Sequence, residues 1–272
     1  MRFKPYRRVR RIVRRPWVIL KAALADAGYP VTANDARLKR LEGVHSGRRC
    51  FVIGNGPSLT IADLDRLQGE ITFAANKVYL AFADTRWRPT YYFVVDRVVA
   101  ESNRQAIVDL TLDKYAVDLL RPLLGRTGFT YFDIRGGSRR DVRHGLDVGA
   151  TVISSMVQFA YYMGCSEIYL VGVDFDFVLA PETGEVNNGG ERILVSSGER
   201  NHFHPDYRAP GERWTAPRLD VQRAFFERQA SFMRDREGRD VLFNASRRSK
   251  LDVLPKVDFD RLFDADETVP VR

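Results

Sequence analysis

Cys50-Phe51-Val52-Ile53 followed by Gly54-Asn55-Gly56-Pro57-Ser58 is the stretch of sequence that decides the fold. A short apolar run that ends in glycines is typical of a buried strand, and helical periodicity follows at residues 61–67. Glycines at such a junction let the backbone approach a phosphate or a ribose, and free N–H groups at a helix start favour anions. The stretch therefore predicts a nucleotide or nucleotide-sugar site at Gly54, Asn55, Gly56, Pro57 and Ser58.

Two well-known phosphate-binding patterns are excluded at this loop. The Gly-Lys-Ser/Thr ending of a Walker loop is missing, and the spacing is not that of the Gly-x-Gly-x-x-Gly dinucleotide pattern. A plain tight turn with Ser58 as a helix cap is the structural alternative.

Outward from the loop, apolar runs alternate with segments of helical periodicity. Strands are predicted at residues 50–53, 71–75, 91–95, 129–134, 168–173 and 241–243. Helices are predicted at residues 33–41, 61–67, 98–110, 151–163 and 224–236. This alternation predicts an α/β fold with a Rossmann-like, mostly parallel sheet covered by helices on both faces, formed by one domain at residues 33–264.

Polar residues follow several of the predicted strands directly. Because ligands of parallel sheets bind beyond the carboxyl ends of the strands, these residues are expected to converge on one site. The predicted nucleotide-binding set comprises Gly54, Asn55, Gly56, Pro57, Ser58, Asn76, Asp96, Thr151 and Asp174.

Asp174 and Asp176 are separated by one residue. In an extended segment, alternate side chains point the same way, so both carboxylates could face one metal ion or one ribose. Solvated or helix-capping acids at a strand end are the alternative.

The segment Asn201-His202-Phe203-His204-Pro205-Asp206-Tyr207 contains two of the four histidines of the chain. An imidazole removes a proton from a hydroxyl near neutral pH, so His202 and His204 are candidate catalytic bases, with surface-loop histidines as the alternative. Zinc is not expected, since no further ligand with suitable spacing is nearby. The surrounding residues 179–218 are rich in Gly, Asn, Pro and Ser and are predicted to form a flexible lid.

The composition favours a soluble cytoplasmic protein. The chain has 272 residues, of which 44% are hydrophobic and 29% charged, and no apolar run approaches the roughly 18 residues that a membrane-spanning helix needs. No secretory signal is recognised. Cys50 and Cys165 are expected to be buried free thiols.

The net charge of +8 is concentrated at the N-terminus. Eight Lys and Arg residues lie within residues 2–15, the first acidic residue is Asp26, and the chain after residue 15 is formally neutral. Residues 1–32 are therefore predicted to form a basic amphipathic arm that lies on an anionic membrane surface. A disordered arm and a nucleic-acid arm are the alternatives, but nucleic acid is not an expected partner. Residues 265–272 are a C-terminal tail.

Several ordered motifs resemble the MptE-like proteins, a family named after an archaeal 6-hydroxymethylpterin diphosphokinase. The resemblance spans residues 49–263, and its last motifs fit a bacterial branch that is often associated with surface-polysaccharide synthesis. It rests on Phe51-Val-Ile-Gly-Asn-Gly-Pro-Ser-Leu59, Phe73-Ala-Ala-Asn-Lys77, Glu167-Ile-Tyr-Leu-Val-Gly-Val-Asp174, Asn201-His-Phe-His-Pro-Asp-Tyr207, Asn244-Ala-Ser-Arg-Arg-Ser-Lys-Leu251 and Val257-Asp-Phe-Asp260.

The same motifs resemble, more distantly, bacterial sialyltransferases that use CMP-activated sugars. That resemblance implies that Asn55, Ser58 and Asn76 contact the nucleotide. It also implies that a base between residues 202 and 207 deprotonates the acceptor hydroxyl, and leaves His202, His204 and Asp206 open for this role. The tyrosines that hold the leaving phosphate in those enzymes have no clear match at residues 175–177.

Two enzymatic functions follow from these resemblances. The favoured one is a glycosyltransferase that needs no cofactor and moves a sugar, such as a nonulosonate or another 3-deoxy acid, from a CMP donor to a glycan or lipid-linked acceptor at the inner face of the cytoplasmic membrane. The alternative is a diphosphokinase that uses ATP and Mg²⁺, with Asp174 and Asp176 as metal ligands. A regulatory nucleotide-binding module is a third, non-enzymatic hypothesis.

Overall fold

The computed structural model describes residues 29–134, 141–147, 149–186 and 192–264, together with Leu20, Ala23, Leu24 and Ala27. Most of the predicted basic arm and the whole predicted C-terminal tail (residues 265–272) lie outside the described residues. Their roles stay predictions. Among the described residues, no helix is both long and apolar enough to cross a membrane.

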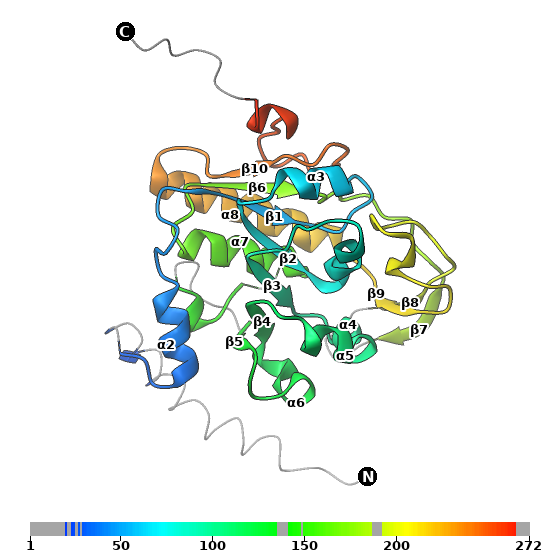
Figure 1. The fold of residues 1–272 in the computed structure, drawn as a ribbon, viewed down its shortest axis with the longest axis horizontal. Coiled ribbons are helices and arrows are strands. Elements are labelled where there is room, and N and C mark those ends of the chain that lie inside the picture. The colour runs from blue at the N-terminus through cyan, green and yellow to red at the C-terminus, as the bar shows by residue number, and fades with distance from the viewer. Residues whose placement is uncertain are drawn as a thin grey trace.

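A seven-stranded parallel sheet forms the centre of the molecule (Figure 1). Its strands are β1 (Arg49–Ile53), β2 (Ile71–Ala75), β3 (Tyr91–Val94), β4 (Lys114–Val117), β5 (Thr130–Phe132), β6 (Glu167–Val171) and β10 (Leu242–Asn244). They are arranged in the order β10-β6-β1-β2-β3-β4-β5, and every neighbouring pair is parallel. The predicted α/β fold with a Rossmann-like sheet is confirmed.

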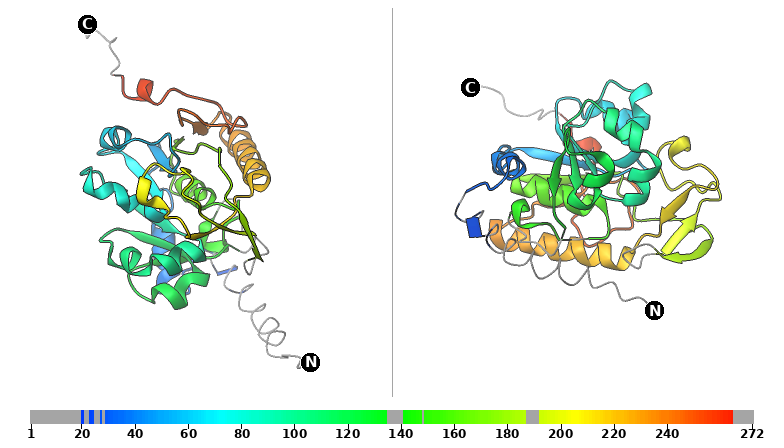
Figure 2. Two further views of the ribbon diagram at one scale, coloured as in Figure 1. Left: turned by 90° about the vertical axis from the view of Figure 1, so that its right-hand side faces the viewer. Right: turned by 90° about the horizontal axis from the view of Figure 1, so that it is seen from below.

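Helices connect and surround these strands (Figures 1 and 2). The α-helices are α2 (Ala33–Arg40), α3 (Ile61–Arg66), α4 (Arg97–Ser102), α5 (Arg104–Asp109), α6 (Arg121–Leu124), α7 (Val152–Tyr162) and α8 (Leu219–Glu237). The 3-10 helices are η1 (Asn76–Ala83), η2 (Asp118–Leu120), η3 (Val142–His144), η4 (Pro205–Tyr207) and η5 (Asp260–Leu262). Helix α7 is apolar and buried, and it contacts β1, β2, β3 and β6 on one side and α8 on the other.

The strand order creates a topological switch point between β1 and β6. From β1 the chain adds β2 to β5 successively on one side, and then returns to place β6 and β10 on the other side of β1. Connections that leave two adjacent parallel strands in opposite directions open a crevice at their carboxyl ends, where ligands of such sheets bind. The residues that follow β1 and β6 therefore meet where a ligand site is expected.

The structure differs from the prediction at one helix and at one strand of the main sheet. The helix predicted at residues 98–110 is two helices, because Asn103 has φ −124° and ψ 23° and interrupts the helical backbone between α4 and α5. Strand β4 was not predicted, since its four residues include the charged Lys114 and show no alternation of apolar and polar residues.

Residues 179–218 contain a second, three-stranded antiparallel sheet in the order β7-β8-β9, which the sequence did not predict. Its strands are β7 (Glu182–Val186), β8 (Arg192–Val195) and β9 (Arg213–Thr215), and it lies beyond the end of the main sheet (Figures 1 and 2). It has a small core in which Leu194 and Trp214 are buried with Phe177 against them. We call residues 179–218 the insert; its predicted role as a mobile lid stays a prediction.

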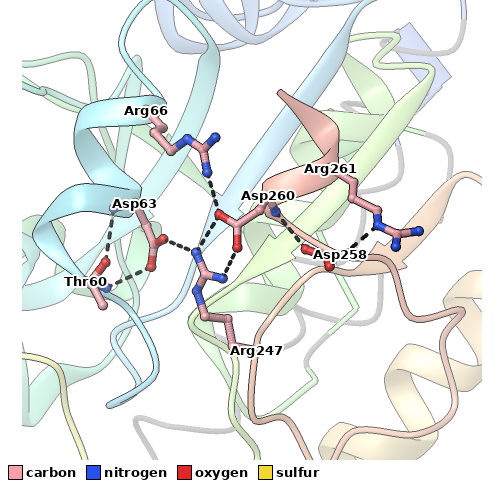
Figure 3. Close-up of polar contacts among 7 residues, drawn as sticks. All are labelled: Thr60, Asp63, Arg66, Arg247, Asp258, Asp260 and Arg261. Carbon is pink, nitrogen blue, oxygen red and sulfur yellow. Dashed lines mark hydrogen bonds and ion pairs between the residues drawn. The ribbon is translucent and has the colours of Figure 1, made fainter. Parts of the chain in front are cut away.

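The segment after β10 is fastened to α3 by an ion-pair network (Figure 3). Nη2 of Arg247 donates to Asp63 at 2.7 Å and to Asp260 at 3.0 Å, and Arg66 also pairs with Asp260. A hydrogen bond from the N–H of Lys250 to the carbonyl of Asp174, at 2.8 Å, holds the same segment against the loop after β6. The segment after β10 is therefore fixed both to α3 and to the end of β6.

Candidate functional site

Gly54 and Gly56 allow the loops after β1 and β6 to touch. A Cβ atom on Gly54 would lie 2.3 Å from the carbonyl oxygen of Gly172, and one on Gly56 would lie 2.6 Å from Oδ2 of Asp174. Real Cβ atoms do not approach other atoms this closely. The two glycines are therefore required for the contact between the loops, whether or not a phosphate also approaches them.

The loop amides already have acceptors within the protein. The N–H groups of Gly54 and Gly56 donate to the carbonyl oxygens of Val171 and Gly172, at 2.7 and 2.8 Å. The N–H of Ser58 donates to Oδ2 of Asp174 at 2.7 Å. The expectation that these three amides are free to hold an anion is therefore wrong for this conformation.

The helix after the loop begins later than expected if Ser58 were its cap. Thr60, not Ser58, is the N-cap of α3, and it forms a reciprocal capping box with Asp63. Ser58 instead donates its hydroxyl to Asp174. Both the glycines and Ser58 thus serve the junction between β1 and β6.

Asp174 and Asp176 do not share an extended segment. Gly172 has φ +67° and Phe175 has φ +57°, so the alternation on which the common orientation was predicted is broken. Asp174 binds Ser58, while Asp176 accepts from Nζ of Lys250 at 2.8 Å. Burial raises the pKa of Asp174, and the hydrogen bonds from Ser58 partly offset this. In the described part of the chain no group of three or more His, Cys, Asp or Glu residues is placed to hold a metal ion.

A cleft of about 1070 Å³ opens at the switch point, between the ends of the main sheet and the insert. Eight of the nine predicted nucleotide-binding residues line it, and Asp176 does so as well. The eight are Gly54, Asn55, Gly56, Pro57, Asn76, Asp96, Thr151 and Asp174. Ser58 is not among the lining residues, so the structure places it behind the cleft wall.

Two amide side chains in the cleft wall have an unpaired carbonyl oxygen. Nδ2 of Asn55 donates to the carbonyl of Ala75 at 3.0 Å and to the hydroxyl of Tyr207 at 3.1 Å. Oδ1 of Asn55 and Oδ1 of Asn76 are buried and have no hydrogen-bond partner among the described residues. Buried polar atoms are normally paired, so these oxygens are suited to the hydroxyl or amino groups of a ligand after a small rearrangement.

Asp96 and Thr151 each begin a helix at the cleft. Asp96 accepts from the N–H of Val98 at 2.7 Å at the start of α4, and Thr151 accepts from the N–H of Ile153 at 3.3 Å at the start of α7. Both are thus N-caps in the structure, which fixes their side chains at the cleft wall.

His202 is the catalytic candidate that the structure brings into the cleft. Its half-buried ring stacks on Tyr207, with 3.8 Å between ring centroids and 4° between planes. The adjoining Phe203 N–H donates to the carbonyl of Asn55 at 3.0 Å and so fixes this segment against the glycine loop. Burial, with Arg208 and Lys77 nearby, lowers the pKa of His202 well below 6.5. The imidazole is therefore neutral at pH 7 and able to accept a proton.

The other two catalytic candidates lie elsewhere. Nδ1 of His204 accepts from the N–H of Asp206 at 3.1 Å and caps η4. The side chain of Asp206 is 83% exposed. Neither residue is among the described residues that line the cleft. The sequence could not separate the three, because the turn at Pro205 decides which side chain faces inward.

Three residues at the site were not predicted. Nζ of Lys77 donates to the carbonyl of Tyr207 at 2.8 Å and to Glu212 at 2.6 Å, which ties the insert to the end of β2. The guanidinium of Arg208 lies 3.9 Å from the ring centroid of Trp214, and both side chains line the cleft. Burial lowers the pKa of Arg208. Their sequence positions gave a weak signal, since Lys77 ends one of the quoted motifs and Arg208 follows another.

Comparison with known proteins finds a matching family model and a solved structure of similar fold. A family model described as "6-hydroxymethylpterin diphosphokinase MptE-like" matches residues 30–179, which is more than half of the chain. Among curated protein sequences, none matches.

One solved structure, described as the "Structure of MAf glycosyltransferase from Magnetospirillum magneticum AMB-1", is similar with a TM-score of 0.50 and 15% sequence identity. The similarity covers 80% of this chain and 35% of that chain, so this chain spans about a third of that protein. At this identity the likeness concerns the fold alone.

Proposed function

Because this chain belongs to the MptE-like family, we propose that it is a nucleotide-dependent transferase that moves a sugar from a CMP-activated donor to a surface-polysaccharide acceptor. The observation that carries the proposal is the neutral imidazole of His202 in a cleft at the switch point of a Rossmann-like sheet. Ligands of open α/β sheets, nucleotides among them, usually bind in such a crevice.

The cleft offers the groups that a nucleotide needs. Its volume of about 1070 Å³ exceeds the usual upper range for a small-molecule site, so it has room for a nucleotide and a sugar together. The unpaired oxygens of Asn55 and Asn76 would accept from the amino group of a base or from ribose hydroxyls. Asn55 and Asn76 are two of the three residues that the resemblance to sialyltransferases implies for the nucleotide, and the third, Ser58, does not line the cleft.

In the proposed reaction His202 is the general base. Its neutral imidazole removes the proton of an acceptor hydroxyl as that oxygen attacks the anomeric carbon of the donor sugar. The bond between the anomeric carbon and the CMP phosphate breaks, and CMP leaves with the bonding electron pair. Stacking on Tyr207 and the hydrogen bond from Phe203 to Asn55 hold the imidazole in place.

The second candidate function is the diphosphate transfer from ATP that the family description names. It would use Mg²⁺, for which Asp174 and Asp176 were the expected ligands. Those carboxylates do not fit one ion as they stand, because Asp174 binds Ser58 and Asp176 binds Lys250. We therefore derive no step through a metal ion and favour sugar transfer.

The proposed acceptor is a glycan or a lipid-linked sugar at the inner face of the cytoplasmic membrane. This part of the proposal depends on the eight basic residues within residues 2–15, which suit an anionic lipid surface. Sedimentation with anionic liposomes tests it: full-length protein should bind, and a chain that starts at Val31, which keeps α2 and its N-cap Thr32, should not. Equal binding by both proteins would refute the membrane role.

A thermal-shift panel with CMP, CDP, ATP and 6-hydroxymethylpterin, each with and without Mg²⁺, separates the two enzymatic functions. A ligand present at 100 times its dissociation constant stabilises the folded protein by about 2.7 kcal/mol. Sugar transfer predicts stabilisation by CMP that is independent of Mg²⁺. Stabilisation by ATP that requires Mg²⁺ would favour the diphosphokinase, and no shift with any nucleotide would contradict both.

Three matched variants test the base. H202N should bind CMP as the wild type does and lose about 100-fold or more in turnover, since general-base catalysis contributes roughly 10²–10⁴-fold. H204N and D206N should keep turnover, because neither side chain lines the cleft. Full turnover in H202N would refute the role of His202.

A further inference from the structure

Arg208 and Trp214 form a stacked pair on the insert side of the cleft. Arg208 follows η4, Trp214 belongs to β9, and the guanidinium lies 3.9 Å from the ring centroid. Both residues line the cleft, opposite the glycine loop on the main sheet. A guanidinium that lies over an aromatic ring contacts the ring with its face, and its N–H groups point outward in the plane of the guanidinium.

Both side chains carry a buried N–H group without an acceptor. Nη1 of Arg208 and Nε1 of Trp214 have no hydrogen-bond partner among the described residues. A buried donor without an acceptor costs free energy, and two such donors in one stacked pair need an explanation. An anionic group in the cleft would satisfy both after a small movement of the side chains.

The nearest carboxylate does not fill this role. Oε1 of Glu199 forms an ion pair with Nη1 of Arg208 at 3.8 Å, which is too long for a hydrogen bond, and this oxygen has no hydrogen-bond partner of its own among the described residues. Oε2 of Glu199 is held by Ser196 and Ser197. Arg208 lines the cleft and Glu199 is not among the lining residues, so Glu199 offsets the charge of Arg208 without occupying the cleft.

Two more acidic residues act on Arg208 from neighbouring elements, and both have other partners. Glu212 accepts from Lys77 at 2.6 Å, and Asp96 caps α4. Neither is a hydrogen-bond acceptor for Arg208 in the structure. The local charges therefore leave the arginine buried and incompletely paired.

The glycine loop offers few donors to an anion in the cleft. The N–H groups of Gly54, Gly56 and Ser58 all have acceptors within the protein. Other donors that line the cleft, such as Arg208, are therefore better suited to an anionic substrate.

We propose that Arg208, supported by the indole N–H of Trp214, is the binding site for an oxyanion of the donor, either its phosphate or a carboxylate on the transferred sugar. Planar guanidinium groups bind both chemistries through paired N–H donors. The assignment deepens the proposed function and rests on it for the identity of the donor.

Calorimetric titration of the full chain tests the site with four probes: cytidine, CMP, N-acetylneuraminate and CMP-N-acetylneuraminate. R208Q should weaken the probe whose oxyanion is bound by about 10- to 100-fold and leave cytidine unchanged. Weaker CMP binding identifies the phosphate. Unchanged CMP binding with weaker binding of both sugar probes identifies the carboxylate. W214F, which keeps an aromatic ring but lacks the indole N–H, should show a smaller loss of affinity for the same probes.

R213Q is the matched control, because it also removes one arginine from the cleft lining and leaves the stacked pair intact. It should change each affinity by less than about threefold. R208K keeps the charge and loses the paired donors, so it replaces R208Q in the test if R208Q does not fold. We expect R208K to bind the same probe about tenfold more weakly than the wild type does. Wild-type affinities in R208Q or R208K, or an equal loss for cytidine, would overturn the proposal.

A failure of the proposed function can be distinguished from a failure of the proposed oxyanion site. If the wild type binds neither CMP nor CMP-N-acetylneuraminate, sugar transfer from CMP is refuted, and inorganic phosphate and free N-acetylneuraminate then probe the subsite alone. Stabilisation of the wild type by either probe, lost in R208Q, would support the oxyanion site. Equal behaviour of the two proteins would overturn it.

Discussion

Replacing Gly54 by alanine tests whether the glycine loop exists to bring β1 and β6 together. The added Cβ would lie 2.3 Å from the carbonyl oxygen and 2.8 Å from the carbonyl carbon of Gly172. Both are backbone atoms of the neighbouring strand end and cannot rotate away. The loops must therefore separate by about 1 Å to restore ordinary contact.

The cost follows from what this separation breaks. Overpacking of a tight contact costs about 1–3 kcal/mol. The hydrogen bonds from Gly54 to Val171 and from Gly56 to Gly172, at 2.7 and 2.8 Å, would lengthen, and each contributes about 0.5–1.5 kcal/mol. We expect G54A to lose about 2–5 kcal/mol in urea unfolding and roughly 5–15 °C in Tm.

Gly69 provides the control. It has φ +84°, and an added Cβ would meet nothing within 4 Å, so G69A measures left-handed strain without a clash. A loss of about 1–2 kcal/mol is expected. If G54A were no less stable than G69A, the close approach of the two loops would not be what requires glycine there.

Three further changes have defined outcomes. S58A should lower the free energy of unfolding by about 1–3 kcal/mol, because the buried carboxylate of Asp174 loses its hydroxyl donor; a loss of CMP affinity without a loss of stability would contradict this. K77M should cost about 2–3 kcal/mol and speed proteolysis within the insert, since Glu212 loses its ion pair; an unchanged cleavage rate would argue against this anchor. Because the pKa of His202 is lowered from 6.5, the unfolded chain binds its proton more readily, and stability should fall as the pH drops below 6.5, by up to about 1.4 kcal/mol per pH unit. H202N should remove this contribution to the change of unfolding free energy with pH, measured by urea unfolding between about pH 5 and 7. If H202N leaves the pH dependence unchanged, the imidazole of His202 is not buried in the wild type.

The sequence predicted the main sheet because its strands are buried on both faces. Strands such as β1 and β2 are continuous apolar runs, and the helices between them show clear periodicity. The insert was not predicted to contain strands because β7 is largely exposed and β9 has only three residues, so neither shows a pattern. The order of strands, and with it the switch point, depends on contacts between distant segments.

The site was predicted at the right place and in part with the wrong chemistry. Convergence at the strand ends follows from parallel topology, which explains why Asn55, Asn76 and Asp174 meet in one cleft. Whether a backbone N–H group of the glycine loop is free depends on the neighbouring strand. The last residue of β6 and the residue after it supply the acceptors for Gly54 and Gly56, and the local sequence of the loop does not indicate this.

The two aspartates and the buried arginine show the same limit. The positive φ of Phe175 turns Asp176 away from the partner of Asp174, and a positive φ in a residue other than glycine gives no sequence signal. Arg208 is recognised as a site residue only once β9 brings Trp214 against it.

A crystal structure of the full chain with bound CMP would decide whether the cleft at the switch point is a nucleotide site. We expect CMP in the cleft between the ends of β1 and β6, with its base or ribose on the side-chain oxygens of Asn55 and Asn76 and with His202 beside the remaining space. CMP bound outside this cleft, or a cleft that stays empty at saturating CMP, would refute the nucleotide site.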